Sequence, residues 1–189
     1  MRKLIAGINM TLDGFCDHTA VTADDELHQH YNDLLRKAGV IMWGRITYHL
    51  MQSYWPTVVN DPTGNKAMDE FAVLAQNIPK IVFSHTLNNA DPTIVGWKNV
   101  KLAKAGLKEE VLELKKQPGR DILVGSPSLI VAAKNLNLID EYQLCVHPVI
   151  AGNGLPLFKN INDSGTLKLL KTKTFSSGAI ALYYEPTKK

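Results

Sequence analysis

The stretch Val40-Ile41-Met42-Trp43-Gly44-Arg45-Ile46-Thr47 joins a predicted buried strand to a predicted short helix that begins at Arg45. An apolar run of this kind is typical of a strand covered on both faces, and Gly44 lies where the strand turns into the helix. The first turn of the helix carries the cation Arg45 and no acid. The helix dipole instead favours a negative charge at the helix N-terminus, by about 0.3–1 kcal/mol. We therefore expect an external anion here, held by free backbone N–H groups, the Thr47 hydroxyl and the Arg45 guanidinium.

A second junction has the same form. Residues 121–124 are predicted to form a short buried strand, Gly125 makes the turn, and Ser126 and Pro127 suit the N-cap and the first position of a helix. In open α/β sheets, ligands bind beyond the carboxyl ends of the strands. Two such junctions suit the phosphates of a dinucleotide. The alternative interpretation is that both are ordinary strand-to-helix turns.

The composition is that of an ordinary globular domain. The chain has 189 residues, of which 45% are hydrophobic and 21% charged, and we expect one domain over residues 1–186. A net charge of +3 is too small to indicate a nucleic-acid partner. Cys16 and Cys145 form no disulfide framework. Because the sequence also shows no signal peptide and no membrane span, we expect a cytoplasmic protein without a membrane partner.

Strand-like and helix-like segments alternate along most of the chain, which predicts an α/β fold with a mostly parallel central sheet and helices on both faces. The pattern changes after residue 138, where a long strand and a hairpin around Ser176-Ser177-Gly178 predict an antiparallel edge. The predicted strands span residues 3–9, 40–43, 80–84, 100–103, 121–124, 139–150, 166–175 and 179–185, and the predicted helices span residues 24–38, 62–76 and 107–117, with two more beginning at residues 45 and 127.

Several motifs together resemble one known family. They are Gly44-Arg45-x-Thr47, the loop Asn9-Met10-Thr11-Leu12-Asp13-Gly14-Phe15, the strand Lys80-Ile81-Val82-Phe83-Ser84, and residues 138–142 followed by 148–158. In order and spacing they resemble the dihydrofolate-reductase-like fold, in the branch formed by the reductase domain of the riboflavin-biosynthesis deaminase–reductase and its stand-alone relatives. The resemblance covers nearly the whole chain, and the last motif is the most specific.

The resemblance implies that the chain binds NADPH. It would place Gly44, Arg45 and Thr47 on the cofactor phosphates, Ser84 and His85 near the adenosine phosphate, and Gly125, Ser126 and Ser128 at the pyrophosphate. Gly152 and Gly154 suit a bulge or a close approach of the backbone to the cofactor, and the alternative is a simple turn. Two positions depart from the family pattern. His85 replaces a frequent arginine, and Ser126 replaces a frequent glycine. A neutral histidine is the weaker phosphate partner, so the preference for NADPH over NADH stays open.

The substrate region is less well specified by the sequence. The loop after the first strand would cover the nicotinamide, which makes Asp13 the candidate catalytic carboxylate and a candidate substrate ligand. Asn9, His30 and Trp55 are further candidate substrate ligands. The alternatives are a plain Asp-Gly turn at Asp13, a solvated or rim histidine at His30, and local packing at Trp55.

The acidic residues of the predicted helix over residues 24–38 indicate whether it could form a folate site, because a folate reductase has a carboxylate on the inner face of this helix. Its apolar stripe contains Leu27, Tyr31, Leu34, Leu35 and Ala38, and Asp33 faces away from it. Only Asp24, at the helix start, lies near the inner face, where it suits a partner for the helix dipole equally well. The usual folate carboxylate is therefore not indicated.

We expect no metal site. His28 and His30 are two residues apart on a helix and do not share a face, and adjacent residues such as Cys16, Asp17 and His18 seldom converge on one ion.

The sequence thus predicts an NADPH-dependent reductase of a small organic substrate. By resemblance it is most like 5-amino-6-(5-phosphoribosylamino)uracil reductase and forms a homodimer. The alternatives are a dihydrofolate-type reductase and a non-catalytic NADP-binding protein.

Overall fold

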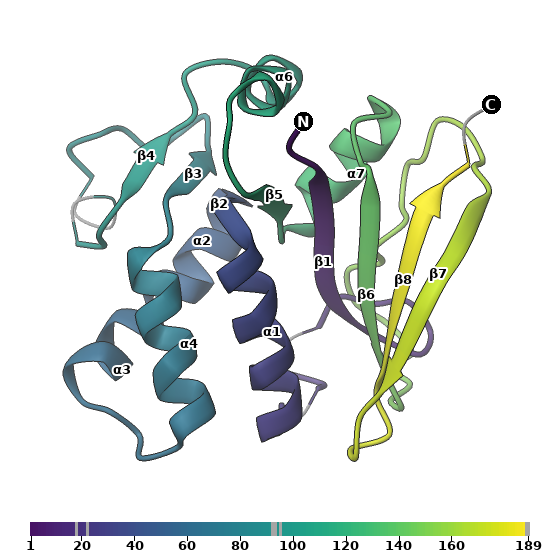
Figure 1. Cartoon of the computed structure of the whole chain (residues 1–189), viewed down its shortest axis with the longest axis horizontal. Coiled ribbons are helices and arrows are strands. Elements are labelled where there is room, and N and C mark those ends of the chain that lie inside the picture. Colours follow the sequence, from purple (N-terminus) through teal and green to yellow (C-terminus); the bar gives the residue numbers. More distant parts are fainter. Residues whose placement is uncertain (18, 22, 92–93, 95, 188–189) are drawn as a thin grey trace.

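In the computed structural model, one eight-stranded sheet has helices packed on both faces (Figure 1). The structure describes residues 1–17, 19–21, 23–91, 94 and 96–187. The strand order is β4-β3-β2-β5-β1-β6-β8-β7. All pairings from β4 to β6 in this order are parallel, and β8 and β7 add an antiparallel edge. The strands are β1 (Leu4–Thr11), β2 (Ala38–Gly44), β3 (Lys80–Phe83), β4 (Val100–Leu102), β5 (Asp121–Val124), β6 (Glu141–His147), β7 (Leu167–Thr174) and β8 (Ile180–Pro186).

The predicted fold class is confirmed, and three details differ. The helices are α1 (Asp25–Lys37), α2 (Arg45–Gln52), α3 (Trp55–Asn60), α4 (Lys66–Asn77), α6 (Leu107–Lys116) and α7 (Pro127–Asn135). The helix predicted from residue 62 begins later, because the Asn65 side chain caps it by accepting from the N–H groups of Ala67 and Met68. The strand predicted over residues 139–150 ends at His147, before a proline that has no N–H to donate. Helix α3 was not predicted, since six residues carry too little periodicity.

The central strands have a buried side chain on each face of the sheet. In β1, Leu4, Ala6 and Ile8 belong to the core under α6 and α7, while Ile5 packs in the core under α1, α2 and α4. This alternation follows from the two-residue period of a strand. Helix α1 presents Leu34 to the sheet as predicted. The resulting order of layers fixes which loops meet at each edge of the sheet.

Strand β7 forms one edge of the sheet and has a pairing partner, β8, on one side only. Leu169 and Leu170 on this strand are exposed. The expected homodimer stays a prediction, for which this edge is the available surface. In the described residues, no helix has both the length and the apolar character needed to cross a bilayer.

Lys80, in β3, is fully buried and ties three segments together. Its ammonium donates to the carbonyl oxygens of Gln76, Ile78 and Lys98 at 3.1, 2.9 and 2.9 Å. It also lies 4.5 Å from the ring centroid of Trp97, at cation–π distance. The bonds join β3 to the end of α4 and to the segment that precedes β4, so they hold the β3–β4 edge against the rest of the sheet.

Replacing Lys80 tests this role. Lys80→Met keeps the apolar stem but leaves buried carbonyl oxygens without a donor, and we expect it to lower the free energy of unfolding by roughly 2–4 kcal/mol. Urea denaturation followed by circular dichroism measures the change. The matched control is Lys101→Met in the neighbouring strand β4, where the lysine is exposed, with an expected change within about 0.5 kcal/mol. Equal effects of the two variants would contradict the assigned role.

Candidate functional site

The loops that could form a site gather at one edge of the sheet. Strands β1 to β6 all run in the same direction, so their carboxyl ends meet there. Gly44 ends β2, Ser84 follows β3 and Gly125 follows β5. Thr11 and His147 end β1 and β6 at the same edge, where they are register partners. This is the edge at which open α/β sheets bind ligands.

A cavity of about 820 Å³ opens over the ends of β2, β3 and β4. Six of the ten predicted cofactor residues line it together: Gly44, Arg45, Thr47, Ser84, His85 and Ser128. The volume falls in the range typical of ligand sites. Residues that are up to 84 positions apart in the chain therefore share one concave surface, as the predicted dinucleotide site requires.

The cavity is suited to anions. Helices α2 and α7 begin at it with no side-chain cap and no acid in the first turn, whereas Asp24 and Asn65 cap α1 and α4. Their terminal N–H groups are therefore available to a ligand. Arg45, His85 and Lys104 add exposed cationic or titratable groups, and no Asp or Glu is found among the described residues that line the cavity.

Gly125 and Ser126 shape this cavity without lining it. Ser126 is only 1% exposed, and its hydroxyl accepts from the backbone N–H of Gly44 at 2.8 Å. Ser126 is the N-cap residue of α7, as predicted, but its side chain makes no capping hydrogen bond to the helix and binds the N–H of Gly44 in β2. A Cβ at Gly125 would lie 3.2 Å from Trp43 Nε1, so glycine allows close approach of β2 and β5. Of the three residues predicted at the pyrophosphate, Ser128 alone reaches the cavity.

Sequence analysis missed one wall of the cavity. Lys104 and Gly106, between β4 and α6, also line it. A helix start at Leu107 was predicted, but nothing local indicates that β4 pairs with β3 and so brings this segment beside His85. The acids Glu109 and Glu110 in the first turn of α6 distinguish this helix start from those of α2 and α7.

Asp13 links two loops beyond the ends of β1 and β6. Its carboxylate accepts from the N–H groups of Ala151 and Gly152 at 3.1 and 2.7 Å and from the Thr11 hydroxyl at 2.6 Å. The Thr11 hydroxyl bond and the Gly152 N–H bond lower the pKa of Asp13 to about 2. The group is therefore ionised at neutral pH and cannot serve as a proton donor there. The predicted catalytic carboxylate has a structural task that sequence analysis did not assign.

Gly152 and Gly154 belong to this second loop and do not line the cofactor cavity. Both have positive φ angles, of 74° and 137°. A Cβ at Gly154 would lie 3.5 Å from the Phe15 side chain. Glycine is needed here for the turn and for packing against the loop after β1. Both lie outside that cavity, and their predicted cofactor contact stays a prediction.

Asn9 lies at the centre of a short polar network. Its Oδ1 accepts from the Tyr31 hydroxyl at 3.0 Å and lies 3.1 Å from His147 Nε2. Burial raises the pKa of Tyr31 well above 10 and lowers that of His147, so both groups are neutral at pH 7. Sequence analysis placed Tyr31 in an apolar stripe and did not single out His147. Only the packing of α1 over β1 and β6 shows them to be polar partners of Asn9.

Trp55 extends the same surface. It begins α3, packs on Phe71 of α4 with ring centroids 4.4 Å apart, and has an edge contact with His28 on α1 at 6.3 Å. His28 lies one turn before Tyr31 on the helix, and the Asn9–Tyr31 and His28–Trp55 pairs are all half-buried. We name these four residues the aromatic surface.

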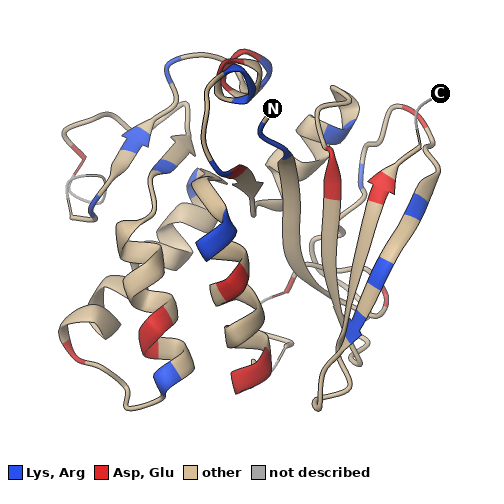
Figure 2. Cartoon of the chain, viewed as in Figure 1, with Lys and Arg blue, Asp and Glu red and all other residues tan. Residues whose placement is uncertain are grey.

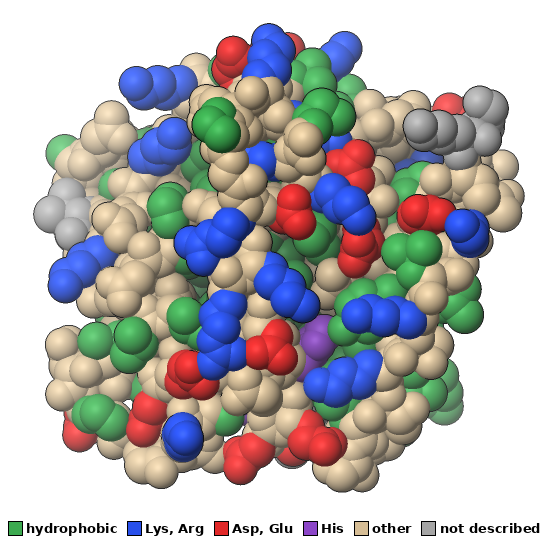
Figure 3. All heavy atoms as spheres, viewed as in Figure 1, with side chains coloured by type: hydrophobic (Ala, Val, Ile, Leu, Met, Phe, Trp, Pro, Cys, Tyr) green, Lys and Arg blue, Asp and Glu red, His purple; other side chains and the backbone are tan. Residues whose placement is uncertain are grey.

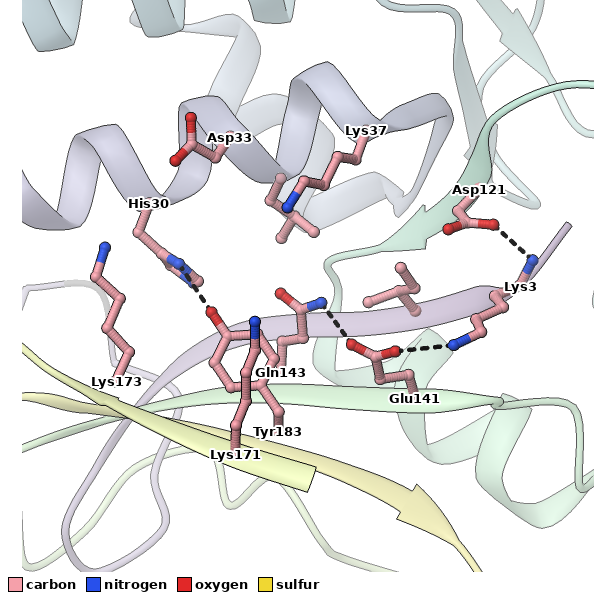
Figure 4. Close-up of a pocket in the computed structure, with 12 residues that line it drawn as sticks. Lys3, His30, Asp33, Lys37, Asp121, Glu141, Gln143, Lys171, Lys173 and Tyr183 are labelled. Carbon is pink, nitrogen blue, oxygen red and sulfur yellow. Dashed lines mark hydrogen bonds and ion pairs between the residues drawn. The ribbon is translucent and has the colours of Figure 1, made fainter. Parts of the chain in front are cut away.

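His30 is not part of the aromatic surface. It is 6% exposed, and its Nδ1 lies 3.3 Å from the hydroxyl of Tyr183 in β8. Its side chain lines a different cavity, between α1 and the β7–β8 hairpin (Figure 4). The expectation of a solvated or rim histidine is wrong, because the hairpin covers the ring. The structure does not bring His30 to the other predicted substrate ligands.

Among the described residues, no group of three or more His, Cys, Asp and Glu side chains is arranged to hold a metal ion. His18, the last of the three adjacent residues considered as ligands, lies outside the described part of the chain.

The burial of His30 predicts a pH dependence of stability. Burial, reinforced by Lys173, lowers the pKa of His30 from 6.5 to about 4; Lys171 and Lys37 act in the same direction and Asp33 opposes them. The unfolded chain therefore binds a proton at a higher pH than the folded chain, so stability falls as the pH falls from 6.5 to 4. The loss from this group is at most about 3 kcal/mol.

Urea unfolding across this pH range checks the effect. His30→Leu removes the titrating group, and we expect its stability to decline less steeply than that of the wild type between pH 6.5 and pH 4. The control is His28→Leu, at a half-buried histidine on the same helix. Parallel curves for the wild type and His30→Leu would contradict the assignment.

Comparison with known proteins places the chain in a family. The model of the RibD C-terminal domain matches residues 2–181. The YyaP protein of Bacillus subtilis is 35% identical, over 97% of this chain and 94% of its own length. Two solved structures share the fold. A putative riboflavin biosynthesis protein from Shewanella sp. PV-4 has a TM-score of 0.74 and 18% identity, and the match covers 98% of this chain and 99% of that protein. A pyrimidine reductase-like protein from Corynebacterium diphtheriae has a TM-score of 0.66 and 17% identity, and the match covers 100% of this chain and 93% of that protein. The chain belongs to the RibD C-terminal domain family.

Proposed function

We propose that the chain is an NADPH-dependent reductase of a small organic substrate. The observation that carries this proposal is the carboxylate-free cavity, which combines two uncapped helix N-termini with Arg45, His85 and Lys104. Such a lining matches the spaced phosphates of a dinucleotide. Membership of a family whose structural neighbours include a pyrimidine reductase-like protein supports a reductase.

The residues present fit NADPH. Arg45, Thr47 and the first N–H groups of α2 would hold one phosphate group, and the start of α7 at Ser128 would hold another. Ser84, His85 and Lys104 would face the adenosine phosphate, with Lys104 supplying a cationic partner. When bound, NADPH supplies the hydride, so the chain has to orient both molecules and exclude water.

The aromatic surface is the proposed substrate wall. Asn9 would present its amide to a polar heterocycle, held in place by Tyr31 and His147. Trp55 would cover an apolar face. Asp13 would fix the loops that close over the substrate and contribute negative charge. We propose a substrate most like that of 5-amino-6-(5-phosphoribosylamino)uracil reductase, which is one of the two activities in the name of a deaminase–reductase from Thermotoga maritima that shares the fold and of which this chain covers 57%.

Cofactor binding is tested with Arg45→Ala. Loss of the guanidinium removes a charge-assisted contact to phosphate, and we expect the Kd for NADPH to rise about tenfold or more in isothermal titration calorimetry. Arg36→Ala is the matched control, since Arg36 makes surface ion pairs with Asp33 and Glu70 on the other side of the molecule. Absence of heat with wild-type protein at millimolar NADPH, or the same Kd in both variants, would overturn the proposal.

The reaction is tested by the consumption of NADPH with two substrates. We expect turnover with the ribosylamino-pyrimidine and none with dihydrofolate, because Asp24 Oδ1 caps α1 and Asp33 is exposed and paired with Arg36. Turnover with dihydrofolate would instead favour a folate-type reductase. Tight NADPH binding without turnover on either substrate, or on aldehydes, imines and quinones, would indicate a non-catalytic NADP-binding protein.

A further inference from the structure

A second cavity, of about 330 Å³, lies away from the cofactor cavity and shares no lining residue with it. It opens between α1 and the β6–β8–β7 part of the sheet (Figure 4). Lys3, Asp121 and Glu141 mark its position at the amino ends of β1, β5 and β6, the edge opposite the proposed active site. A ligand held here would not compete with the cofactor for space.

Side chains from α1 and β7 line this cavity at the spacing expected for a helix and a strand. On α1, His30, Asp33 and Lys37 are three and four residues apart and follow one face of the helix. On β7, Lys171 and Lys173 are two apart and share a face of the sheet, and Lys171 is the register partner of Tyr183. Figure 2 shows the basic positions recurring along β7.

The carboxylates that line the cavity are already paired. Asp121 accepts from the backbone N–H of Lys3 at 2.8 Å. Glu141 lies 3.3 Å from the ammonium of Lys3 and accepts from the Gln143 amide at 2.8 Å. Asp33 also lines the cavity, and its carboxylate is paired with Arg36. All three carboxylates that line the cavity thus already have hydrogen-bond or ion-pair partners within the protein.

The lysines at the other end lack such partners. Within the described residues, no carboxylate lies within 4.0 Å of the ammonium of Lys37, Lys171 or Lys173. Lys171 lies over the ring of Tyr183 at 4.3 Å, and Lys173 lies over Phe175 at 4.9 Å. Contacts with ring faces restrict the two amines without using their N–H donors.

His30 and Tyr183 form the floor between these lysines. The Tyr183 hydroxyl and His30 Nδ1 lie 3.3 Å apart, and both residues are buried. After burial itself, Lys173 is the largest cause of the lowered pKa of His30, and Lys171 and Lys37 contribute with the same sign. The charges of all three ammonium groups therefore influence the same side chain, His30. Figure 3 shows basic side chains around a histidine in a hollow on this face.

We propose that this cavity binds a small dianion, in the form of the phosphate group of a small molecule. Three amines without an ion pair within 4.0 Å in the described residues match the charge of a phosphate better than that of one carboxylate, even with Glu26 acting on Lys173 and Asp33 on His30 at longer range. The His30–Tyr183 pair supplies a polar floor, and the volume accommodates a compact phosphate monoester. The inference does not depend on the proposed reductase activity, because the two cavities are separate.

Binding is tested with inorganic phosphate as the probe and the His30 ring as the reporter. At about pH 7.5, where inorganic phosphate is largely a dianion, we expect phosphate at about 10 mM to shift the His30 ring signals in NMR spectra of the wild type. Acetate at the same ionic strength serves as the monoanion comparison. We expect acetate to have little effect.

Variants localise the effect. We expect Lys171→Gln combined with Lys173→Gln to weaken phosphate binding roughly tenfold or more, whereas Lys168→Gln on the same strand, where the lysine is paired with Glu185, leaves it unchanged. Arg45→Ala should retain the phosphate response, so failure of the cofactor proposal is distinguishable from failure of this one. No His30 shift in the wild type, equal shifts with acetate, or equal losses in the Lys168 and double variants would overturn the proposal.

Discussion

The common direction of strands β1 to β6 is the constraint on which the rest of the structure depends. Because these strands run parallel, every loop that leaves a carboxyl end emerges at one edge. Residues as distant as Gly44 and Ser128 then meet at one cavity. The Gly44–Ser126 hydrogen bond locks the ends of β2 and β5 together, so two helix N-termini open side by side. A candidate anion site thus arises from the backbone N–H groups of two helix N-termini, held together by the Ser126 hydroxyl.

The carboxyl and amino edges of the sheet differ in how their charged groups are paired. At the carboxyl edge, uncapped helix starts and cations surround a large cavity without carboxylates. At the amino edge, acids and lysines alternate, but each acid is paired while Lys37, Lys171 and Lys173 are left facing one small cavity. Charge pairing, rather than the number of charges, distinguishes a ligand site from a solvated surface in both places.

The proposed active site contains a carboxylate, but it is held as an anion. The Thr11 hydroxyl and two backbone N–H groups keep Asp13 ionised, so its contribution is loop order and negative charge. The neutral Tyr31–Asn9–His147 network offers orientation in its place. Hydride transfer needs little more than orientation and a dry site, which is consistent with a surface poor in ionised side chains.

The sequence by itself determined the features that arise from neighbouring residues. Helix dipole sign, glycine turns and apolar periodicity identified the Gly44-Arg45-Thr47 junction, the layered fold and the exposed position of Asp33, since each depends on residues within one or two turns. Only the tertiary structure decided which distant groups pair. The Ser126 hydroxyl binds an N–H 82 residues away, the β7–β8 hairpin buries His30, and the pairing of β4 with β3 brings Lys104 to the cavity at the carboxyl edge. Strand order and the packing of helices and hairpin on the sheet determine these contacts, so no local sequence pattern predicts them.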